Sequence, residues 1–179
     1  MKKQLIGALV GSLILFFWQF ISWGLVEIHG PQMAYTPKQD AVLQALIDTG
    51  IEEGTYFVPR APSGSSAAEA EAFMNEHVGK PWAIVSYHES LQNRQGMNMF
   101  RGWVIDFISV LLLCWLLLKM ANLDFKTAVL ASLAVGLIGY FTIAYLYSIW
   151  FESDSIPYLI DTIVQWGICG AWLGWWLNR

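Results

Sequence analysis

The chain has 179 residues, with 10 Lys and Arg against 14 Asp and Glu, and a formal net charge of −4. Hydrophobic residues make up 56% of it and charged residues 13%, and a soluble domain of this size could not bury so much apolar surface. The composition therefore indicates a membrane protein. It excludes a nucleic-acid binder that depends on net positive charge, because no basic excess is present.

Four segments are long and apolar enough to cross a bilayer core of about 30 Å as helices. The first follows Lys2 and Lys3. It is too long for the apolar core of a signal peptide, and no small-residue cleavage site follows it, so we expect an uncleaved signal anchor. The predicted spans are residues 1–26 (apolar from Leu5 to Val26), 103–120, 127–149 and 158–177.

The positive charges near the span ends predict the orientation. Lys2 and Lys3 precede the first span, Lys119 and Lys126 lie at the turn between the second and third spans, and Arg179 ends the chain. Cytoplasmic loops carry an excess of Lys and Arg. We therefore expect a multi-pass protein of the bacterial inner membrane, with both termini cytoplasmic and residues 27–102 outside.

The outward segment, residues 27–102, is too long for a loop without structure of its own. Capping and turn signals predict a helix from Thr36 to about Thr49 and a second at residues 67–77. Short strands are predicted at residues 55–58 and 81–88. A flexible lead is expected at residues 92–99.

The predicted fold is therefore a mainly α membrane protein. A four-transmembrane-helix bundle carries a small α/β extracytoplasmic domain between its first two helices. Such a small domain buries a low fraction of its surface. We expect it to pack on the outer ends of the helices or on a partner.

Small residues recur four apart along three of the predicted spans. In lipid, such patterns let helix backbones approach closely. The glycines predicted to pack helices together are Gly7, Gly11, Gly136, Gly139, Gly170 and Gly174.

Polar residues gather at one depth near the outward ends of the spans. Asp106 and Asp161 each lie about one turn inside a predicted span, and ionisable residues there usually face the bundle interior. We predict one polar cluster at this level. Its members are Glu27, His29, Asp106 and Asp161, with Gln19 and Gln165 one turn deeper.

Three hypotheses compete for this cluster. In the first it is structural, with the acids pairing with Arg101, favouring the helix starts through the dipole and bonding to the outward domain. In the second, two carboxylates share a proton or bind a cation. In the third, His29 and the acids bind a metal. No metal-binding His spacing, nucleophile motif or phosphate loop is present, so we predict no cofactor and favour a protein that is not an enzyme.

The chain also resembles a family of uncharacterised bacterial four-span inner-membrane proteins. The family has no activity that could be transferred, so the resemblance implies only the topology and directs attention to His29 and Asp161. The turn from Glu152 to Asp154 departs from the family, which often has more aromatic residues before its fourth helix. The residues that carry the resemblance are Gly7, Gly11, Trp18, Trp23 and His29, the stretches Gly54–Pro59 and Gly79–Trp82, and Tyr158, Asp161, Gly167, Gly170 and Gly174.

These features predict a non-catalytic accessory, assembly or stabilising subunit of a larger envelope membrane complex. Its expected partners are the lipid bilayer and other membrane-protein subunits, and no nucleic acid. The alternative is a small transporter or an ion- or proton-conducting protein that uses Asp106 and Asp161. A membrane enzyme with a metal at His29 is a third hypothesis.

Overall fold

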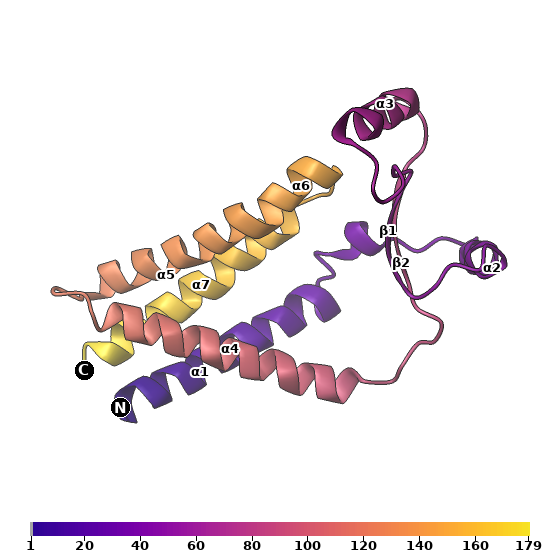
Figure 1. Ribbon diagram of the computed structural model, residues 1–179. Helices are drawn as coiled ribbons and strands as arrows, with labels where there is room; N and C mark the ends of the chain where they lie inside the picture. Colours follow the sequence, from indigo (N-terminus) through magenta and orange to yellow (C-terminus); the bar gives the residue numbers. More distant parts are fainter. Residues whose placement is uncertain (1) are drawn as a thin grey trace. The chain divides into compact units, whose positions relative to one another are not determined.

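A computed structural model describes residues 2–179 and shows a mainly helical protein with a small two-stranded sheet (Figure 1). The chain divides into two compact units. The membrane unit comprises the residues up to Ala34 together with Arg94–Arg179, and the outer unit comprises Tyr35–Asn93. Each unit is described by itself below.

Three helices among the described residues are long and apolar enough to cross a membrane, which confirms the membrane prediction at this level. The first joins α1 (Lys2–Phe20) to the π-helical turn η1 (Ile21–Leu25). The second is the single helix α4 (Gln95–Leu117). The third joins α5 (Phe125–Gly139), the π-helical segment η3 (Tyr140–Tyr145) and α6 (Leu146–Phe151).

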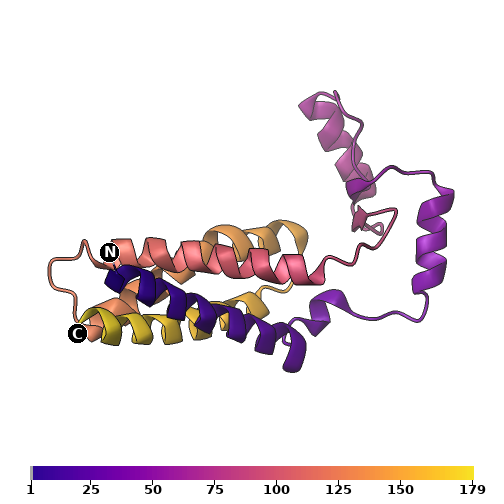
Figure 2. The same cartoon turned by 90° about the horizontal axis from the view of Figure 1, so that it is seen from below.

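The remaining long helix is α7 (Ile156–Leu177). It packs against both α5 and α1, and α1 packs in turn against α4. The described chain ends lie at the same end of this bundle (Figures 1 and 2). Two tryptophans of α7 fix it to the start of α1, because Trp172 donates to the Gly7 carbonyl at 3.1 Å and Trp176 to the Lys3 carbonyl at 2.8 Å.

Glycines permit the close helix contacts in five of the six predicted places. A Cβ added to Gly11 would lie 2.6 Å from Val110, and one added to Gly170 would lie 2.8 Å from Ser132. At Gly139 the structure differs from the prediction, because a Cβ there would meet nothing within 4 Å. The glycines that face a neighbouring helix are Gly7, Gly11, Gly136, Gly170 and Gly174.

The outer unit consists of two short helices and a two-stranded antiparallel sheet. Helix α2 (Gln39–Asp48) is followed by strand β1 (Gly54–Val58), helix α3 (Ala67–His77) and strand β2 (Ala83–Tyr87). The strands pair antiparallel, with Gly54 opposite Tyr87 and Val58 opposite Ala83. Helix α3 begins with a capping box, in which Ser66 and Glu69 each bond to the other's backbone N–H.

Two predicted boundaries were wrong. Helix α2 begins at Gln39 rather than Thr36, because residues 36–39 form a turn in which the Lys38 N–H donates to the Thr36 hydroxyl. Helix α4 begins at Gln95, so most of the predicted flexible lead at residues 92–99 is helical. The polar composition of that stretch marks the part of α4 before its apolar run and not a break in the helix.

The outer unit has no core of its own. None of residues 35–93, all of which the structure describes, is buried. Large apolar side chains on both of its helices, on its strands and directly before β2 are more than one third exposed. They are Val42, Leu43, Ile47, Val58, Met74, Trp82 and Ile84.

Candidate functional site

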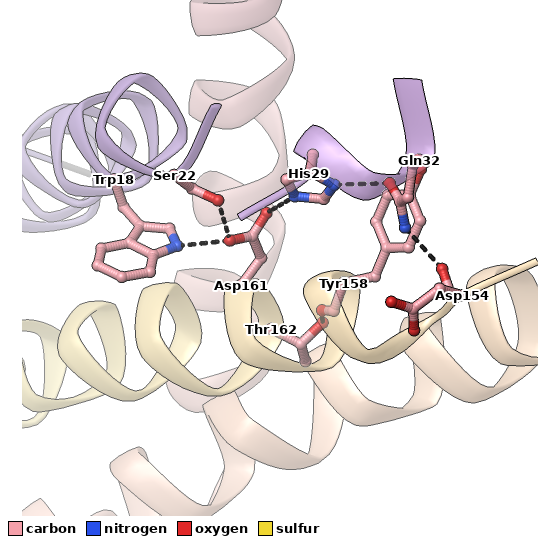
Figure 3. A network of polar contacts seen from close by, with 8 residues as sticks. All are labelled: Trp18, Ser22, His29, Gln32, Asp154, Tyr158, Asp161 and Thr162. Carbon is pink, nitrogen blue, oxygen red and sulfur yellow. Dashed lines mark hydrogen bonds and ion pairs between the residues drawn. The ribbon is translucent and has the colours of Figure 1, made fainter. Parts of the chain in front are cut away.

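The main polar site of the membrane unit centres on Asp161, in the second turn of α7 (Figure 3). Its Oδ1 accepts from Trp18 Nε1 at 2.9 Å and from the Ser22 hydroxyl at 2.6 Å. Its Oδ2 lies 2.9 Å from His29 Nε2. Asp161 is 8% exposed and His29 is 2% exposed, so the pair is shielded from solvent.

The backbone after α1 brings His29 to this place. The helix widens into the π-helical turn η1, where Ser22 lies, and Glu27 then adopts a left-handed conformation with φ of 51°. The Ile28 N–H donates to the Ser22 carbonyl at 3.0 Å, which returns the chain over the helix end. Single π-helical turns often occur at functional positions. This one brings Ser22 and His29 within hydrogen-bond distance of the same carboxylate, that of Asp161.

Aromatic rings fix the plane of the imidazole. The Trp23 ring stacks on His29 with centroids 3.8 Å apart and planes 4° apart. Tyr158 meets the imidazole edge at 4.9 Å. The ring is therefore held on its face and its edge, as well as through its nitrogens.

Gln32 determines which protons the imidazole carries. Its Nε2 donates to the Asp154 carbonyl at 2.6 Å, which directs its Oε1 towards His29 Nδ1 at 2.9 Å (Figure 3). Since a carboxamide oxygen only accepts, Nδ1 must donate. The other ring nitrogen, Nε2, then forms the contact with Asp161 Oδ2. We call the set Trp18, Ser22, His29, Gln32 and Asp161 the Asp161 network.

Asp106 belongs to a second, separate contact. It lies on α4, is 7% exposed, and accepts from Gln19 Nε2 through Oδ1 at 3.0 Å. Its Oδ2 is buried and has no partner among residues 2–179. Within the described residues the Asp106 and Asp161 carboxylates form no bond with each other, because each contacts α1 from a different helix.

The other predicted members of the cluster stand apart. The side chain of Glu27 is exposed, and no hydrogen bond or ion pair joins it to the described residues around Asp161. Gln165 has a buried Oε1 without a partner in the described chain, and it lines a groove of about 340 Å³ together with Gln19 and Asp161. Arg101 makes no ion pair with Asp106 among these residues, contrary to the pairing that the structural hypothesis assumed.

The arrangement brings together one histidine and one carboxylate. Among the described residues, no group of three His, Cys, Asp or Glu side chains is placed to hold a metal ion. The Asp161 network can stabilise the end of α1 against α7 through the hydrogen bonds that Asp161 accepts from α1 and from the turn after it.

The sequence analysis did not predict several side chains that contact Asp161 or His29. Trp18 and Trp23 were not among the predicted members of the polar cluster, yet one bonds to Asp161 and the other stacks on His29. Two residue spacings in the sequence could have indicated these contacts. Trp18 and Ser22 are four residues apart on one helix face, and Gln32 follows His29 by three.

Comparisons with known proteins leave the chain without an assigned relative. No protein-family model matches it, and no curated protein or solved structure matches it.

Proposed function

We propose that this chain is a non-catalytic integral subunit of a larger envelope membrane complex, in which it has an accessory, assembly or stabilising role. The observation that supports the proposal most is the outer unit. It has regular helices and strands, yet none of residues 35–93 is buried. A folded segment with exposed apolar faces gains stability when a partner covers them.

Helix α2 illustrates such a face. Val42, Leu43 and Ile47 lie along one side and are each more than half exposed, whereas Asp40, Gln44 and Asp48 lie along the other. An amphipathic helix of this kind suits a protein groove that takes its apolar side. The partner is therefore another subunit with an apolar surface outside the membrane.

The proposed topology has four spans with both termini in the cytoplasm and residues 27–102 outside the inner membrane. Helix α7 has 22 residues, a length of about 33 Å at ~1.5 Å per residue, which suffices for a bilayer core. Its packing between α5 and α1 supports its inclusion as the fourth span. Membership of the four-span family that the chain resembles would imply the same topology.

The proposal is tested by gentle extraction of the tagged full-length protein from its native membranes, followed by mass spectrometry of the co-purifying proteins. We expect a defined set of subunits in fixed stoichiometry. Isolation of a lone monomer under conditions that preserve other envelope complexes would overturn the proposal.

A pair of photo-crosslinking variants makes the test specific to the outer unit. A photoreactive residue at Val42, on the apolar side of α2, should link to one of those subunits. The same residue at Gln44, on the polar side, serves as the matched control and should not. Links from Val42 only to this chain's own membrane unit would contradict the role of a partner.

A further inference from the structure

Strand β1 of the outer unit has an open edge. The sheet that β1 forms with β2 has two strands, so β1 pairs on one side and no third strand among residues 2–179 lies on its other side. Neither α2 nor α3 packs extensively on β1. A strand directs alternate backbone N–H and C=O groups to each of its two sides, and an open edge is a template for another strand.

A hollow of about 480 Å³ lies at this edge. Every residue from 55 to 60 lines it, and no residue of β2 does. Consecutive side chains of a strand point to opposite faces of the sheet. A hollow that all of them line therefore lies along the edge of β1 and not over one face, which leaves room for another extended chain.

The two ends of β1 carry opposite charges. Glu52 lies two residues before the strand, and Arg60 lies two residues after its end. Both residues are exposed, and neither forms an ion pair with another described residue. Since an antiparallel strand runs in the opposite direction, its start meets Arg60 and its end meets Glu52. A matching strand therefore has an acid before it and a base after it.

Strand β1 of a second copy meets this requirement. When two copies pair antiparallel about Tyr56, the middle residue of β1, the start of each strand lies beside the end of the other. Glu52 of each copy then lies at the same end as Arg60 of the other copy. The half-exposed Val58 lies opposite Gly54, which has no side chain to obstruct it, and the two Tyr56 rings form a cross-strand pair.

We propose that β1 pairs with β1 of a second copy, so that two outer units form one four-stranded antiparallel sheet in the order β2–β1–β1–β2. A lone two-stranded sheet is only marginally stable, and further strands stabilise it. This gain matters for a unit in which none of residues 35–93 is buried. The pairing uses the edge of β1 and not the apolar side of α2, so it does not rest on the proposed protein partner.

Disulfide formation between copies tests the pairing. Full-length Tyr56→Cys protein is oxidised in its native membranes, and the covalent dimer is measured on a non-reducing gel. Residues paired across antiparallel strands have Cα atoms about 4.5–5.5 Å apart, which a disulfide can bridge. Tyr56→Cys should therefore form a covalent dimer.

Val85→Cys is the matched control. Val85 lies opposite Tyr56 on β2, so in the four-stranded sheet it is three strand spacings, about 14 Å, from Val85 of the other copy. This variant should stay monomeric. The native Cys114 and Cys169 are buried and present in both variants.

Charge exchange tests the register. Arg60→Glu and Glu52→Arg each place like charges together at both ends of the strand pair. Either one should slow dimer formation by Tyr56→Cys about fivefold, since two exposed ion pairs contribute at this level. The combined exchange restores opposite charges and should recover the rate. Lys38→Glu makes the same change of net charge as Arg60→Glu at the start of α2 and should leave the rate unchanged.

Absence of the Tyr56→Cys dimer, or a dimer from Val85→Cys as well, would overturn pairing through β1. A combined exchange as slow as the single variants would overturn the register about Tyr56. If Tyr56→Cys fails to fold, energy transfer between fluorescent C-terminal tags in vesicles measures association of the charge variants, and rescue by the combined exchange decides the question. The co-purification experiment detects other subunits, so its outcome is separate from this one.

Discussion

The two units of this protein keep their structure by different means. In the membrane unit, helices α1, α4, α5 and α7 meet through glycines and through the Asp161 network, which joins residues up to 143 positions apart. In the outer unit, the cap of α3 is local, the single strand pair joins residues up to 33 positions apart through backbone hydrogen bonds, and no side chain of residues 35–93 is buried. Buried side-chain contacts define the first unit, whereas hydrogen bonds without a buried core define the second.

The comparison predicts how far a single substitution destabilises each unit. Close packing and buried hydrogen bonds make single substitutions costly, because neighbouring groups cannot rearrange. A unit without a buried core loses mainly the element that carries the substitution. The following experiments test this difference, beginning with the largest expected effect.

Replacing Asp161 should destabilise the membrane unit most. Asp161→Ala leaves Trp18, Ser22 and His29 without their acceptor, and breaking such a buried pair costs about 3–5 kcal/mol. Asp161→Asn retains one oxygen for Trp18 and Ser22 and should cost less than alanine. The free energy of unfolding in bicelles measures both. A cost below about 1 kcal/mol for alanine would contradict a stabilising network.

Adding one methyl group at a helix contact should have the next largest effect. The Cβ of Gly170→Ala would lie 2.8 Å from Ser132 Cβ and 3.0 Å from Val129 Cα, a backbone atom that cannot turn aside. Overpacking of this kind costs about 1–3 kcal/mol. Gly139→Ala is the control, since its Cβ meets nothing, and it should be neutral or stabilising. Equal thermal stability of the two variants would show that the α5–α7 contact tolerates expansion.

Removing the cap of α3 should affect the outer unit alone. Ser66→Ala deletes the hydroxyl that accepts from the Glu69 N–H, which costs a helix about 1 kcal/mol. Hydrogen exchange should become faster in Ala67–His77 and stay unchanged in α1, α4 and α7. Faster exchange in the membrane helices as well would mean that the two units share stability.

Acid should have the smallest effect, and it should act on the same cap. The Ser66 backbone N–H and hydroxyl bond to Glu69 and hold the pKa of its carboxyl below the ordinary value of 4.5. A carboxyl with a lowered folded pKa stabilises the helix above its unfolded pKa and loses this effect as the pH falls through the folded pKa. The protection factor of α3 amides, which corrects for the intrinsic pH dependence of exchange, should therefore be constant from pH 7 to about 4.5 and fall below it.

Two variants separate this effect from general acid unfolding. Glu69→Gln should remove the acid dependence of α3, whereas Glu71→Gln, which changes a neighbouring exposed acid, should retain it. Acid dependence that persists in Glu69→Gln would assign it to another group.

The sequence allowed the apolar helices and the α3 helix to be predicted, because apolar length and turn residues are local signals. The capping box at Ser66 and Glu69 was not predicted. It allowed His29, Asp106 and Asp161 to be placed at similar depth. It did not show that α1 separates the acids, since depth along a helix says nothing about direction around it. The start of α4 was missed for a similar reason, because a polar stretch can continue a helix beyond its apolar part.

The candidate site could be predicted only in part. His29 and Asp161 meet because of a π-helical turn and a left-handed Glu27, and neither follows from the composition of Ile21–Leu25. Gly139 follows the same small-residue pattern as Gly136 but faces open space. A repeat of small residues gives the face of a helix and does not tell whether a neighbour covers every position on it.

The distance along the chain between the members of the Asp161 network sets an order of events during synthesis. The ribosome makes Trp18, Ser22 and His29 first, and Asp161 follows Ser22 by 139 residues. Until α7 emerges, the end of α1 carries polar groups that lack their acceptor. Closure of the bundle is therefore one of the last steps of biogenesis, and a chain interrupted before α7 presents an unsatisfied first helix to the quality-control machinery of the membrane.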